Sequence, residues 1–336
     1  MAKICFRADG IEHQAADGEW LYDVCVDARA TIPFACKAGA CGTCATEVLE
    51  GTENLGKPGL RELRTLGEKG LDPDRYRLPC LGTVAGDVAF GRSALASRAA
   101  RELPVGEAEV ESQRRLNLTV CEVRFFVRTP GFAFQPGQYV IFQIPAEREV
   151  VRRSYSISTT PSDERHFEIC VRAVAGGHGS NYVHRLRTGQ KIRFEGPMGD
   201  FTLRDNDRDI LMVATGTGIS PIKAMLLHLL EQRSNRKVHL LFGVRAVQDI
   251  FYTDFLRGLE AQHPSFRHQL VLSAPDPSRW AGRRGRVTDV VREGSFDAAR
   301  TEAYLCGSKG MVAEVEAILR GKGISAEHIH HENFYY

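Results

Sequence analysis

The chain has 336 residues, of which 26% are charged and 43% hydrophobic, and its formal net charge of +2 gives no ground for a nucleic-acid or membrane partner. No apolar run approaches the ~20 residues that span a bilayer, and the first residues lack the apolar segment of a signal peptide. Nine cysteines, an odd number, suit a reducing compartment better than a disulfide framework, so we expect a cytoplasmic protein of two or three domains.

The N-terminal part of the chain, residues 1–92, predicts one small domain. The dipeptide Asp9-Gly10 favours a tight turn between two strands and therefore predicts a hairpin. Apolar side chains recur on one face of residues 19–27 and predict a helix. Further elements are expected as a strand over 46–49, a helical patch over 60–66 and a closing strand over 87–90.

Four cysteines in this domain carry a clear chemical signal. Three of them are separated by four and then two residues in a loop of small residues, and the fourth lies far downstream; they are Cys36, Cys41, Cys44 and Cys80. Four thiolates at this spacing are typical of a plant-type 2Fe–2S cluster. Gly39 and Gly42 allow the backbone to wrap closely around cluster sulfurs, which accept N–H hydrogen bonds. We therefore predict that the four cysteines bind a 2Fe–2S cluster.

Two other uses of these cysteines are weighed against the cluster. A structural zinc site favours two short Cys-x2-Cys pairs or matching histidines, and only one pair here is that tight. Disulfides suit a small secreted domain, and nothing in this sequence indicates secretion. Zinc and unrelated thiols remain as alternatives. With this motif the segment resembles a plant-type ferredoxin, which implies a β-grasp fold of the α+β class.

A change of pattern separates the next domain from the first. Residues 93–103 are small and charged and are expected to form a linker. Residues 104–205 then alternate apolar and polar side chains between glycines and prolines, which predicts an antiparallel β-barrel. The expected strands cover 108–110, 116–120, 123–128, 139–144, 153–158, 167–171 and 191–195.

The stretch Arg-Ser-Tyr-Ser in this barrel suggests a cofactor site. Arg153 offers a fork of donors for a diphosphate, and Tyr155, two residues on, points the same way and can lie against a planar ring. Ser180 is expected at the N-cap of a helix over 182–186, where N–H groups and the helix dipole favour a phosphate. An ordinary amphipathic strand is the alternative reading of the first motif.

These motifs resemble the FAD-binding barrel of the ferredoxin–NAD(P)H reductase superfamily, whose signature is Arg-x-Tyr-Ser. The resemblance implies that Arg153, Gly179 and Ser180 hold FAD, with Arg153 and Ser180 on its diphosphate. It also implies that Tyr155 packs on the isoalloxazine and that Ser156 lies near its N5 edge.

The last part of the chain, residues 206–336, predicts an α/β domain with a parallel sheet that binds a nucleotide. An apolar run is followed by a glycine loop and by a helix that begins with a proline, and this unit can hold a diphosphate at the helix N-terminus. The loop lacks the third glycine of the usual dinucleotide fingerprint. The expected nucleotide-binding residues are Thr215, Gly216, Gly218 and Pro221.

Further strands and helices are expected to alternate along this domain. Strands are predicted over 210–214, 238–242, 269–273 and 303–306, with helices over 221–232, 249–256 and 287–291 and another opening after Gly307. Three histidines near the C-terminus, His328, His330 and His331, alternate about one isoleucine as in a strand, and a metal site is the alternative.

Two C-terminal motifs extend the resemblance to the superfamily over nearly the whole chain. Leu305-Cys306-Gly307-Ser308 matches its pyridine-nucleotide domain and implies that Cys306 lies beside the nicotinamide C4. As a bare cysteine, Cys306 would be a buried strand residue. The ending Glu332-x-Phe334 implies that an aromatic ring covers the flavin, and two further tyrosines leave open which ring does so.

The expected nicotinamide donor is NADH. NADPH needs cations for its 2′-phosphate, and NADPH members of the superfamily carry serine–arginine after the third strand of this domain. This chain has Ser273-Ala274-Pro275-Asp276, with an acid near that site. Arg245 and the pair Arg283-Arg284 remain as alternative phosphate ligands.

The order of the three domains resembles the reductase components of bacterial multicomponent oxygenases, of the benzoate dioxygenase reductase type. It implies an NADH-dependent oxidoreductase that takes hydride onto FAD and passes single electrons through the 2Fe–2S cluster to a partner. That partner is a Rieske dioxygenase, a diiron monooxygenase or a haem monooxygenase. Two alternatives are another acceptor, such as a deoxysugar dehydrase, and a non-catalytic electron carrier or redox sensor.

Overall fold

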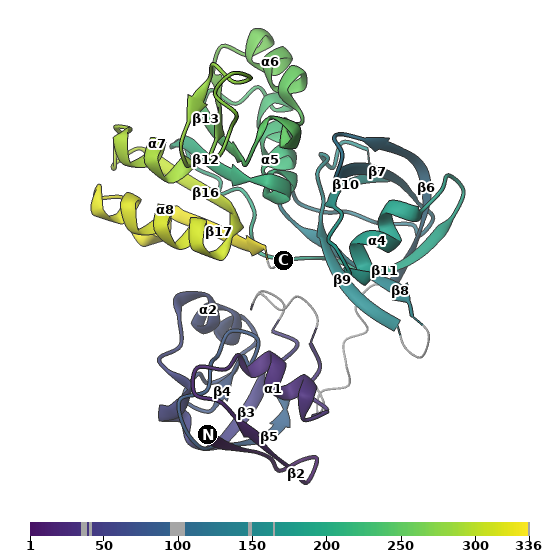
Figure 1. Ribbon diagram of the computed structural model, residues 1–336, viewed down its shortest axis with the longest axis vertical. Coiled ribbons are helices and arrows are strands. Elements are labelled where there is room, and N and C mark those ends of the chain that lie inside the picture. The colour runs from purple at the N-terminus through teal and green to yellow at the C-terminus, as the bar shows by residue number, and fades with distance from the viewer. Residues whose placement is uncertain (35–38, 40–41, 95–104, 147–149, 164, 335–336) are drawn as a thin grey trace. The chain divides into compact units, whose positions relative to one another are not determined.

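The computed structural model describes residues 1–34, 39, 42–94, 105–146, 150–163 and 165–334. The chain forms two compact units, Met1–Val105 and Gly106–Tyr336, whose elements are labelled in Figure 1. Cys36, Cys41 and most of the expected linker fall outside the described residues. None of the helices in the described ranges is long and apolar enough to cross a lipid bilayer.

The first unit is built on a mixed five-stranded sheet of order β2-β1-β5-β3-β4. Strands β1 and β5 run parallel, and β1 pairs antiparallel with β2 around Gly10, so the predicted hairpin is confirmed. Its elements are β1 (Ala2–Phe6), β2 (Ile11–Ala15), α1 (Leu21–Asp27), β3 (Thr46–Glu50), η1 (Thr52–Leu55), α2 (Leu60–Glu68), β4 (Tyr76–Arg77) and β5 (Val88–Ser93).

One apolar core holds this unit together. Ile4 and Phe6 of β1 face Phe90 of β5, and the rings of Phe6 and Phe90 stack with their centroids 5.7 Å apart. Leu21 of α1 and Leu66 of α2 pack against the same core. Both predicted helical segments are thus confirmed, because each buries one apolar face on the sheet.

A buried ion pair fixes the segment that leads to Cys80. Glu62 of α2 and Arg77 of β4 are only 2% and 3% exposed, and the guanidinium donates to both carboxylate oxygens, over 2.9 and 3.1 Å. The same carboxylate accepts the backbone N–H of Leu78 at 2.7 Å, and Arg77 also donates to the carbonyl of Gly56. These hydrogen bonds hold the 76–80 segment against α2.

The second unit begins with an antiparallel barrel, as predicted. Its six-stranded sheet has the order β10-β7-β6-β11-β8-β9, and a bridge between Ile157 and Ile169 joins the two edges. Phe125, Phe142 and Phe167 are fully buried inside it. The strands are β6 (Val105–Arg115), β7 (Val120–Val127), β8 (Tyr139–Pro145), β9 (Val150–Ser156), β10 (His166–Arg172) and β11 (Lys191–Met198).

The strand predicted over 116–120 is wrong except at Val120, the first residue of β7, because residues 116–119 form the turn between β6 and β7. The side chain of Asn117 accepts the backbone N–H groups of Thr119 and Val120, at 2.9 and 2.8 Å, and Leu116 N–H donates to the carbonyl of Val120. Leu118 is exposed at the tip of this turn. An asparagine side chain that satisfies two backbone donors competes directly with a strand ladder.

The helix expected over 182–186 begins earlier, as α4 (His178–Arg185), with Gly177 at its N-cap. Ser180 therefore lies in the first turn and not at the N-cap. Its hydroxyl accepts the backbone N–H of Val174 at 3.1 Å. The hydroxyl thus closes the loop that enters the helix.

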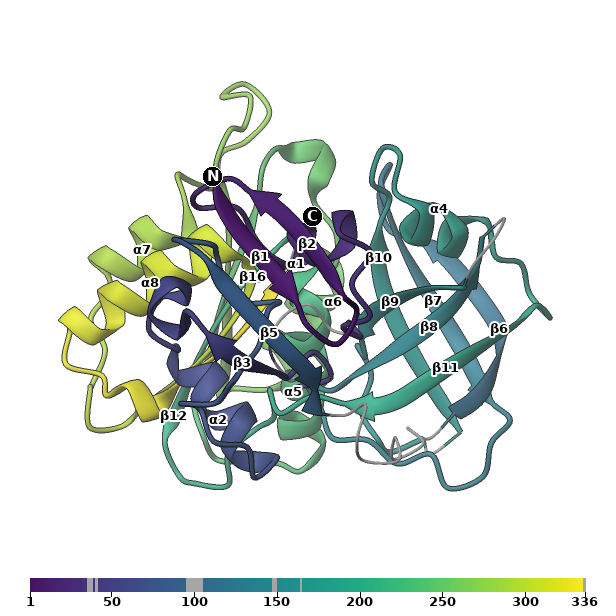
Figure 2. The same cartoon turned by 90° about the horizontal axis from the view of Figure 1, so that it is seen from below.

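The rest of the second unit is a six-stranded sheet of order β15-β14-β13-β12-β16-β17, in which the neighbouring strands pair in parallel. Helices α5 and α6 cover one face, and α7 and α8 cover the other (Figures 1 and 2). The elements are β12 (Asp209–Thr215), η2 (Gly216–Gly218), α5 (Ile219–Glu231), β13 (Val238–Val244), η3 (Val247–Asp249), α6 (Thr253–Gln262), β14 (Phe266–Leu272), β15 (Arg283–Arg284), α7 (Val287–Glu293), β16 (Thr301–Ser308), α8 (Lys309–Gly321), η4 (Ala326–His328) and β17 (Ile329–Phe334).

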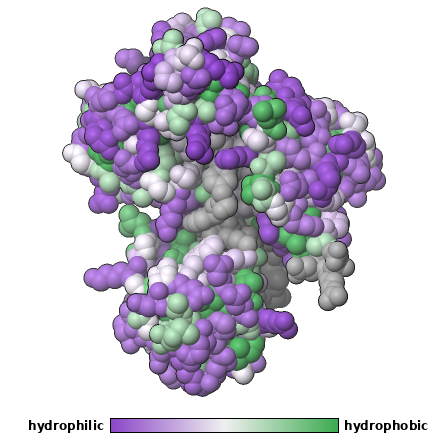
Figure 3. Space-filling model, viewed as in Figure 1, coloured by the Kyte–Doolittle hydropathy of each residue, from purple (hydrophilic) through white to green (hydrophobic). Residues whose placement is uncertain are grey.

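Alternate residues of the central strands face the two helix layers. Met212 and Leu240 belong to the core under α5 and α6, whereas Leu211 and Leu241 belong to the core under α7 and α8. The helix predicted over 249–256 begins later than expected, because Tyr252 has a left-handed backbone with φ of +61° and separates η3 from α6. The visible surface of each unit is mostly hydrophilic (Figure 3).

Replacing Glu62 with alanine should loosen the Cys80 segment. The change leaves the guanidinium of Arg77 buried without its carboxylate, which costs about 3–5 kcal/mol. Hydrogen exchange of the full chain should show lost protection in peptides over 60–80 and unchanged protection in the second unit. Glu53→Ala, which removes an exposed carboxylate of η1, is the control, and equal protection in both variants would contradict the proposed anchoring.

Candidate functional site

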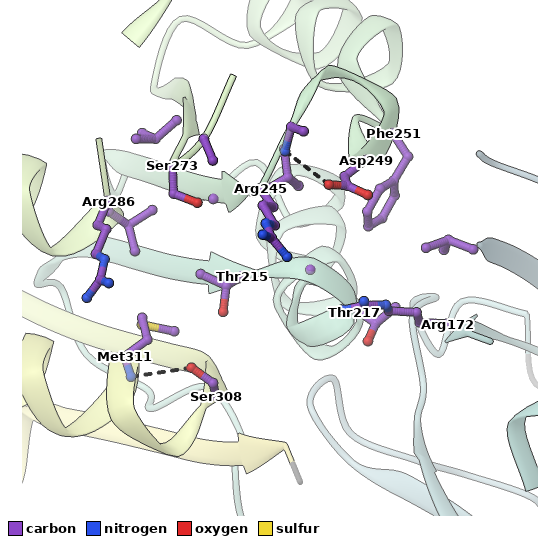
Figure 4. A pocket seen from close by; sticks show the side chains of 18 of the residues that line it. Arg172, Thr215, Thr217, Arg245, Asp249, Phe251, Ser273, Arg286, Ser308 and Met311 are labelled. Carbon is purple, nitrogen blue, oxygen red and sulfur yellow. Dashed lines mark hydrogen bonds between the residues drawn. The ribbon is translucent and has the colours of Figure 1, made fainter. Parts of the chain in front are cut away.

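A cavity of about 990 Å³ opens where the parallel strands of the second unit end (Figure 4). The residues that line it include Thr215 of β12, Val244 of β13, Ser273 after β14 and Ser308 of β16. The chain runs from β12 outward through β13 and β14, and then returns to the other side of β12 as β16. Open α/β sheets bind ligands at such a reversal of strand order.

The predicted glycine loop forms one wall of this cavity. Gly216 and Thr217 line it, and Gly218 lies so close to the carbonyl group of Cys306 that a Cβ there would overlap that backbone. A Cβ on Gly307 would likewise overlap the hydroxyl of Thr215. The loop and the end of β16 are therefore in backbone contact, and both glycines are needed for that contact.

The loop also leads directly into a helix. Helix α5 begins at Ile219, and Pro221 lies in its first turn, where a missing N–H costs no intrahelical hydrogen bond. The N–H groups and the dipole at this helix end favour an anion. Of the residues predicted to bind a nucleotide, Thr215 and Gly216 line the cavity, whereas Gly218 and Pro221 are not among its lining residues.

Three of the predicted residues come together near the end of β16, whose Ser308 lines the cavity. Strands β16 and β17 place Cys306 opposite Glu332, and Ser308 opposite Phe334. The hydroxyl of Ser156, from β9 of the barrel, donates to the carboxylate of Glu332 over 3.1 Å, and both groups are buried. The structure therefore brings Ser156, Cys306 and Glu332 into one neighbourhood that joins the barrel to the sheet. Phe334 is partly buried against the core, and the two tyrosines after it lie outside the described residues.

The barrel residues predicted to hold a flavin also lie together. A Cβ on Gly179 of α4 would come within 2.7 Å of Arg153 and 3.0 Å of the Tyr155 hydroxyl, so this helix start abuts β9. The Tyr155 ring packs against Phe142 with a centroid distance of 5.2 Å, and burial raises the pKa of its phenol, which therefore stays protonated. An exposed guanidinium, the N–H groups of a helix start and an aromatic ring suit a flavin diphosphate and its ring system.

Three arginines at the cavity complete its polar lining. Arg172 comes from β10 of the barrel, Arg245 follows β13, and Arg286 is the N-cap of α7 (Figure 4). Sequence reasoning missed Arg172 and Arg286, because nothing in the sequence shows that a barrel strand and a helix start reach the same cavity. It proposed Arg245 only as an alternative ligand.

The acid that favoured NADH in the sequence does not face the cavity. Asp276 lies in an exposed turn, where its carboxylate accepts the backbone N–H and the hydroxyl of Ser278, at 2.9 and 2.7 Å, and these hydrogen bonds lower its pKa. Ala274, in contrast, does line the cavity. Of the stretch Ser273–Asp276, the residues that line the cavity are thus Ser273 and Ala274, and neither carries a charge.

In the first unit, two of the four predicted cluster ligands lie side by side. The sulfurs of Cys44 and Cys80 are 3.2 Å apart, and both side chains are buried. This separation exceeds the ~2.04 Å of a disulfide bond, so both cysteines are present as thiols. Two adjacent thiols form a soft donor set that suits an iron–sulfur cluster. Cys36 and Cys41 lie outside the described residues.

The surroundings of these thiols fix their positions. The indole N–H of Trp20 donates to the carbonyl of Cys80 over 3.0 Å, and the hydroxyl of Thr65 on α2 donates to the carbonyl of Gly39 over 2.7 Å. Gly39 and Gly42 have φ of +72° and +64°, conformations that favour glycine. The backbone thus favours glycine at positions 39 and 42 of the predicted loop.

The C-terminal histidines serve a structural purpose. His328 and His330 both contact Glu302, over 3.2 and 2.5 Å, and that carboxylate is only 1% exposed. Although burial raises the pKa of Glu302, its contacts with His330 and His328 outweigh this and lower it. Within the described ranges, no group of three histidine, cysteine or acidic side chains is arranged to hold a metal ion.

Comparisons with known proteins cover all three parts of the chain. Family models match a 2Fe–2S iron–sulfur cluster binding domain over residues 6–84, an oxidoreductase FAD-binding domain over 107–203 and an oxidoreductase NAD-binding domain over 212–317. The chain is 32% identical over 323 residues to the ferredoxin–NAD(P)+ reductase component of naphthalene 1,2-dioxygenase/salicylate 5-hydroxylase systems from Ralstonia. That match covers 96% of this chain and 95% of the relative.

Two further proteins extend this likeness. Ferredoxin–NADP reductase B of Sorangium cellulosum is 36% identical over 239 residues, which are 68% of this chain and 97% of the relative. The crystal structure of a cytochrome P450 reductase from Amycolatopsis has a TM-score of 0.67 and 26% identity, and the match covers 99% of each chain. The chain therefore belongs to the ferredoxin–NAD(P)+ reductase family.

This membership confirms the predicted class of protein. The chain is an oxidoreductase whose ferredoxin-like 2Fe–2S domain precedes an antiparallel FAD domain and a parallel-sheet NAD domain. Its relatives include proteins named as reductase or electron transfer components of naphthalene and toluate dioxygenase systems.

Replacing Cys306 with alanine should slow the reduction of bound flavin by NADH by about 10- to 100-fold, because the resemblance to the superfamily implies that this buried residue lies beside the nicotinamide and positions it. Anaerobic stopped-flow absorbance would measure this rate, and the cluster spectrum should be unchanged. Cys121→Ala removes another buried thiol, in the barrel, and should leave the rate unaltered. An unchanged rate in the Cys306 variant would refute this role.

Proposed function

We propose that this protein is the NADH-dependent reductase component of an oxygenase system. Bound FAD accepts two electrons from NADH as hydride and releases them singly, which connects a nicotinamide to a one-electron 2Fe–2S cluster. The convergence of Ser156, Cys306 and Glu332 beside the nucleotide cavity is the observation that carries this proposal. A redox sensor without catalysis would not need these three groups so close together.

The residues at the cavity divide the work of binding. The loop Thr215–Gly218 and the first turn of α5, with Pro221, hold the NADH diphosphate, and Arg172 supplies positive charge from the barrel. Cys306 positions the nicotinamide. The hydrogen bond from Ser156 to Glu332 holds both side chains in place at the junction of the two domains.

In this proposal the flavin is bound mainly by the barrel. Arg153 and the N–H groups from Gly179 to Ser180 bind the FAD diphosphate, and the ring of Tyr155 lies against the isoalloxazine. Phe334, at the end of β17, would contribute an aromatic ring to cover the isoalloxazine, and the two tyrosines after it lie outside the described residues. The hydroxyl of Ser180 orders the loop before the helix, so its backbone N–H is the group offered to a phosphate.

In the first unit, Cys36, Cys41, Cys44 and Cys80 bind the 2Fe–2S cluster. The adjacent sulfurs of Cys44 and Cys80 support this assignment. The domain limits we propose are 1–92 for the ferredoxin domain, 93–103 for the linker, 104–205 for the FAD domain and 206–336 for the NAD domain.

NADH is the proposed donor because Ala274 lines the cavity where an arginine would bind a 2′-phosphate. The arginines at positions 245 and 286 also line it and can contact the ribose or diphosphate. One relative is named for NAD(P)+ and another for NADP, so the choice of donor should be tested with both NADH and NADPH.

The electron acceptor is a terminal oxygenase, as the names of the relatives indicate, and the compartment is the cytoplasm. The Ralstonia relative is named as a component of dioxygenase and hydroxylase systems. The seven cysteines in the described ranges are present as thiols, which suits a reducing compartment.

Anaerobic addition of NADH to the purified protein should bleach both the flavin and the cluster absorbance. In Cys80→Ala the flavin should still bleach, while the cluster spectrum and cytochrome c reduction should be lost, because one ligand of four is gone. Cys5→Ala, at another buried thiol of the same unit, should behave as wild type. A colourless protein, or one that contains zinc in place of iron, would refute the proposal.

Ala274→Arg should raise kcat/KM for NADPH relative to NADH by about tenfold, because one charge-assisted hydrogen bond to a phosphate contributes ~1.5 kcal/mol or more. Steady-state cytochrome c reduction with each donor would measure the ratio. Ala281→Arg adds the same charge at an exposed position that does not line the cavity, and its ratio should stay at the wild-type value. Equal ratios in both variants would place the 2′-phosphate elsewhere.

A further inference from the structure

A buried lysine joins the NAD domain to the FAD barrel. Lys223 lies on α5, in the helix that begins after the nucleotide loop, and it is only 6% exposed. Its ammonium donates to Glu122 of β7 over 2.9 Å and to Glu168 of β10 over 3.1 Å. Helix α5 is buried over most of its surface, because it lies between the parallel sheet and the barrel (Figure 1).

The aromatic rings of the NAD domain enclose the same ammonium from the other side. Its nitrogen lies 5.0 Å from the ring centroid of Tyr252 and 5.5 Å from that of Phe255. The Tyr252 hydroxyl donates to Glu122, the carboxylate that Lys223 also contacts. Two residues of the NAD domain therefore converge on one buried carboxylate of the barrel.

The barrel carboxylates have further partners that hold them in place. Glu122, 7% exposed, accepts from Arg114 over 2.7 Å, and Glu168 pairs with Arg124 over 3.4 Å. Although burial raises the pKa of Glu122, the charge of Lys223 and the hydrogen bond from Tyr252 outweigh this and lower it, so the carboxylate remains ionised.

This network lies close to the nucleotide site in sequence and in space. Ser220, three residues before Lys223, donates to the carbonyl of Cys170 on β10 over 3.4 Å. Asn117, in the turn after β6, donates to the carbonyl of Asp249 over 3.1 Å, and both of these residues line the cavity. The contacts between the two domains thus begin immediately behind the glycine loop.

We propose that Lys223 is a positioning residue for hydride transfer: its ammonium, shared between Glu122 and Glu168, fixes the nucleotide-binding loop and Cys306 relative to the flavin-binding strand β9. The inference rests on the proposed function. An ammonium shared by two carboxylates from neighbouring strands fixes both the separation and the relative orientation of the two domains. Apolar contacts at the same interface do not fix the orientation in this way. Removing it leaves Glu122 and Glu168 with only the arginines of the barrel, Arg114 and Arg124, and without the cation of the NAD domain, and the domains must then shift or admit water.

The test compares variants of the full-length holoprotein by anaerobic stopped-flow absorbance. Lys223→Met should lower the rate of flavin bleaching at saturating NADH by about 10- to 100-fold, the effect of a misplacement of roughly 1 Å. The charge-transfer absorbance between nicotinamide and flavin should fall with it. The inhibition constant of AMP, which carries only the adenylate half of NADH, should not change, because that half takes no part in hydride transfer.

Two further variants separate positioning from folding. Lys223→Arg keeps the charge and should recover most of the rate, whereas Lys237→Met, at an exposed position just before β13, should match wild type. If Lys223→Met does not retain FAD, Glu122→Gln decides the question, since it keeps the side-chain shape and weakens the same contact. A wild-type bleaching rate and charge-transfer band in Lys223→Met, or in Glu122→Gln in that case, would overturn the proposal.

Failure of the two hypotheses can be told apart. A wild-type protein whose flavin NADH does not bleach would refute the proposed function itself. A wild-type protein that bleaches normally, together with variants that bleach equally fast, would refute only the role of Lys223.

Discussion

The site in the second unit depends on one strand arrangement, the parallel pairing of β16 between β12 and β17. This pairing sets Cys306 opposite Ala214 on one side and Glu332 on the other. Glycine at 218 and at 307 then allows the nucleotide loop to touch the end of β16. The hydrogen bond between Ser156 and Glu332 extends the same arrangement to the barrel. The pairing of these strands therefore defines the relative positions of Cys306, Glu332 and the nucleotide loop.

The parts of the fold that follow from periodicity and spacing could be predicted from the sequence. Helices α1, α2 and α5 and the central strands bury regular apolar faces, so their patterns survive in the structure. Cys44 and Cys80, which the spacing of the cysteines predicts to share a cluster, lie together in the structure. These features are local or depend on one residue type at fixed intervals, and a single sequence displays both.

Other features depend on side chains that compete for backbone hydrogen bonds or on contacts between residues far apart in the chain. The pattern of apolar and polar residues does not show either. Residues 116–120 alternate apolar and polar side chains as a strand does, but the amide side chain of Asn117 satisfies two backbone donors and makes a turn. Arg172 and Lys223 act across the boundary between the barrel and the sheet, and neither has a neighbour in sequence that reveals its partner. The sequence also does not show that the carboxylate of Asp276 is hydrogen-bonded within an exposed turn and does not line the cavity. Its charge is therefore a poor guide to the choice between NADH and NADPH.

Arg77 of the first unit shows why the shape of a cation can matter more than its charge. Its planar group makes two hydrogen bonds to one carboxylate and, through a separate nitrogen, another to the carbonyl of Gly56. Lysine carries the same charge but has a single nitrogen and cannot reproduce this pattern of three separate donors. A comparison that scores arginine and lysine as equivalent would therefore misjudge tolerance at this position, where the exchange Arg77→Lys, natural or engineered, would disturb the strand that precedes Cys80.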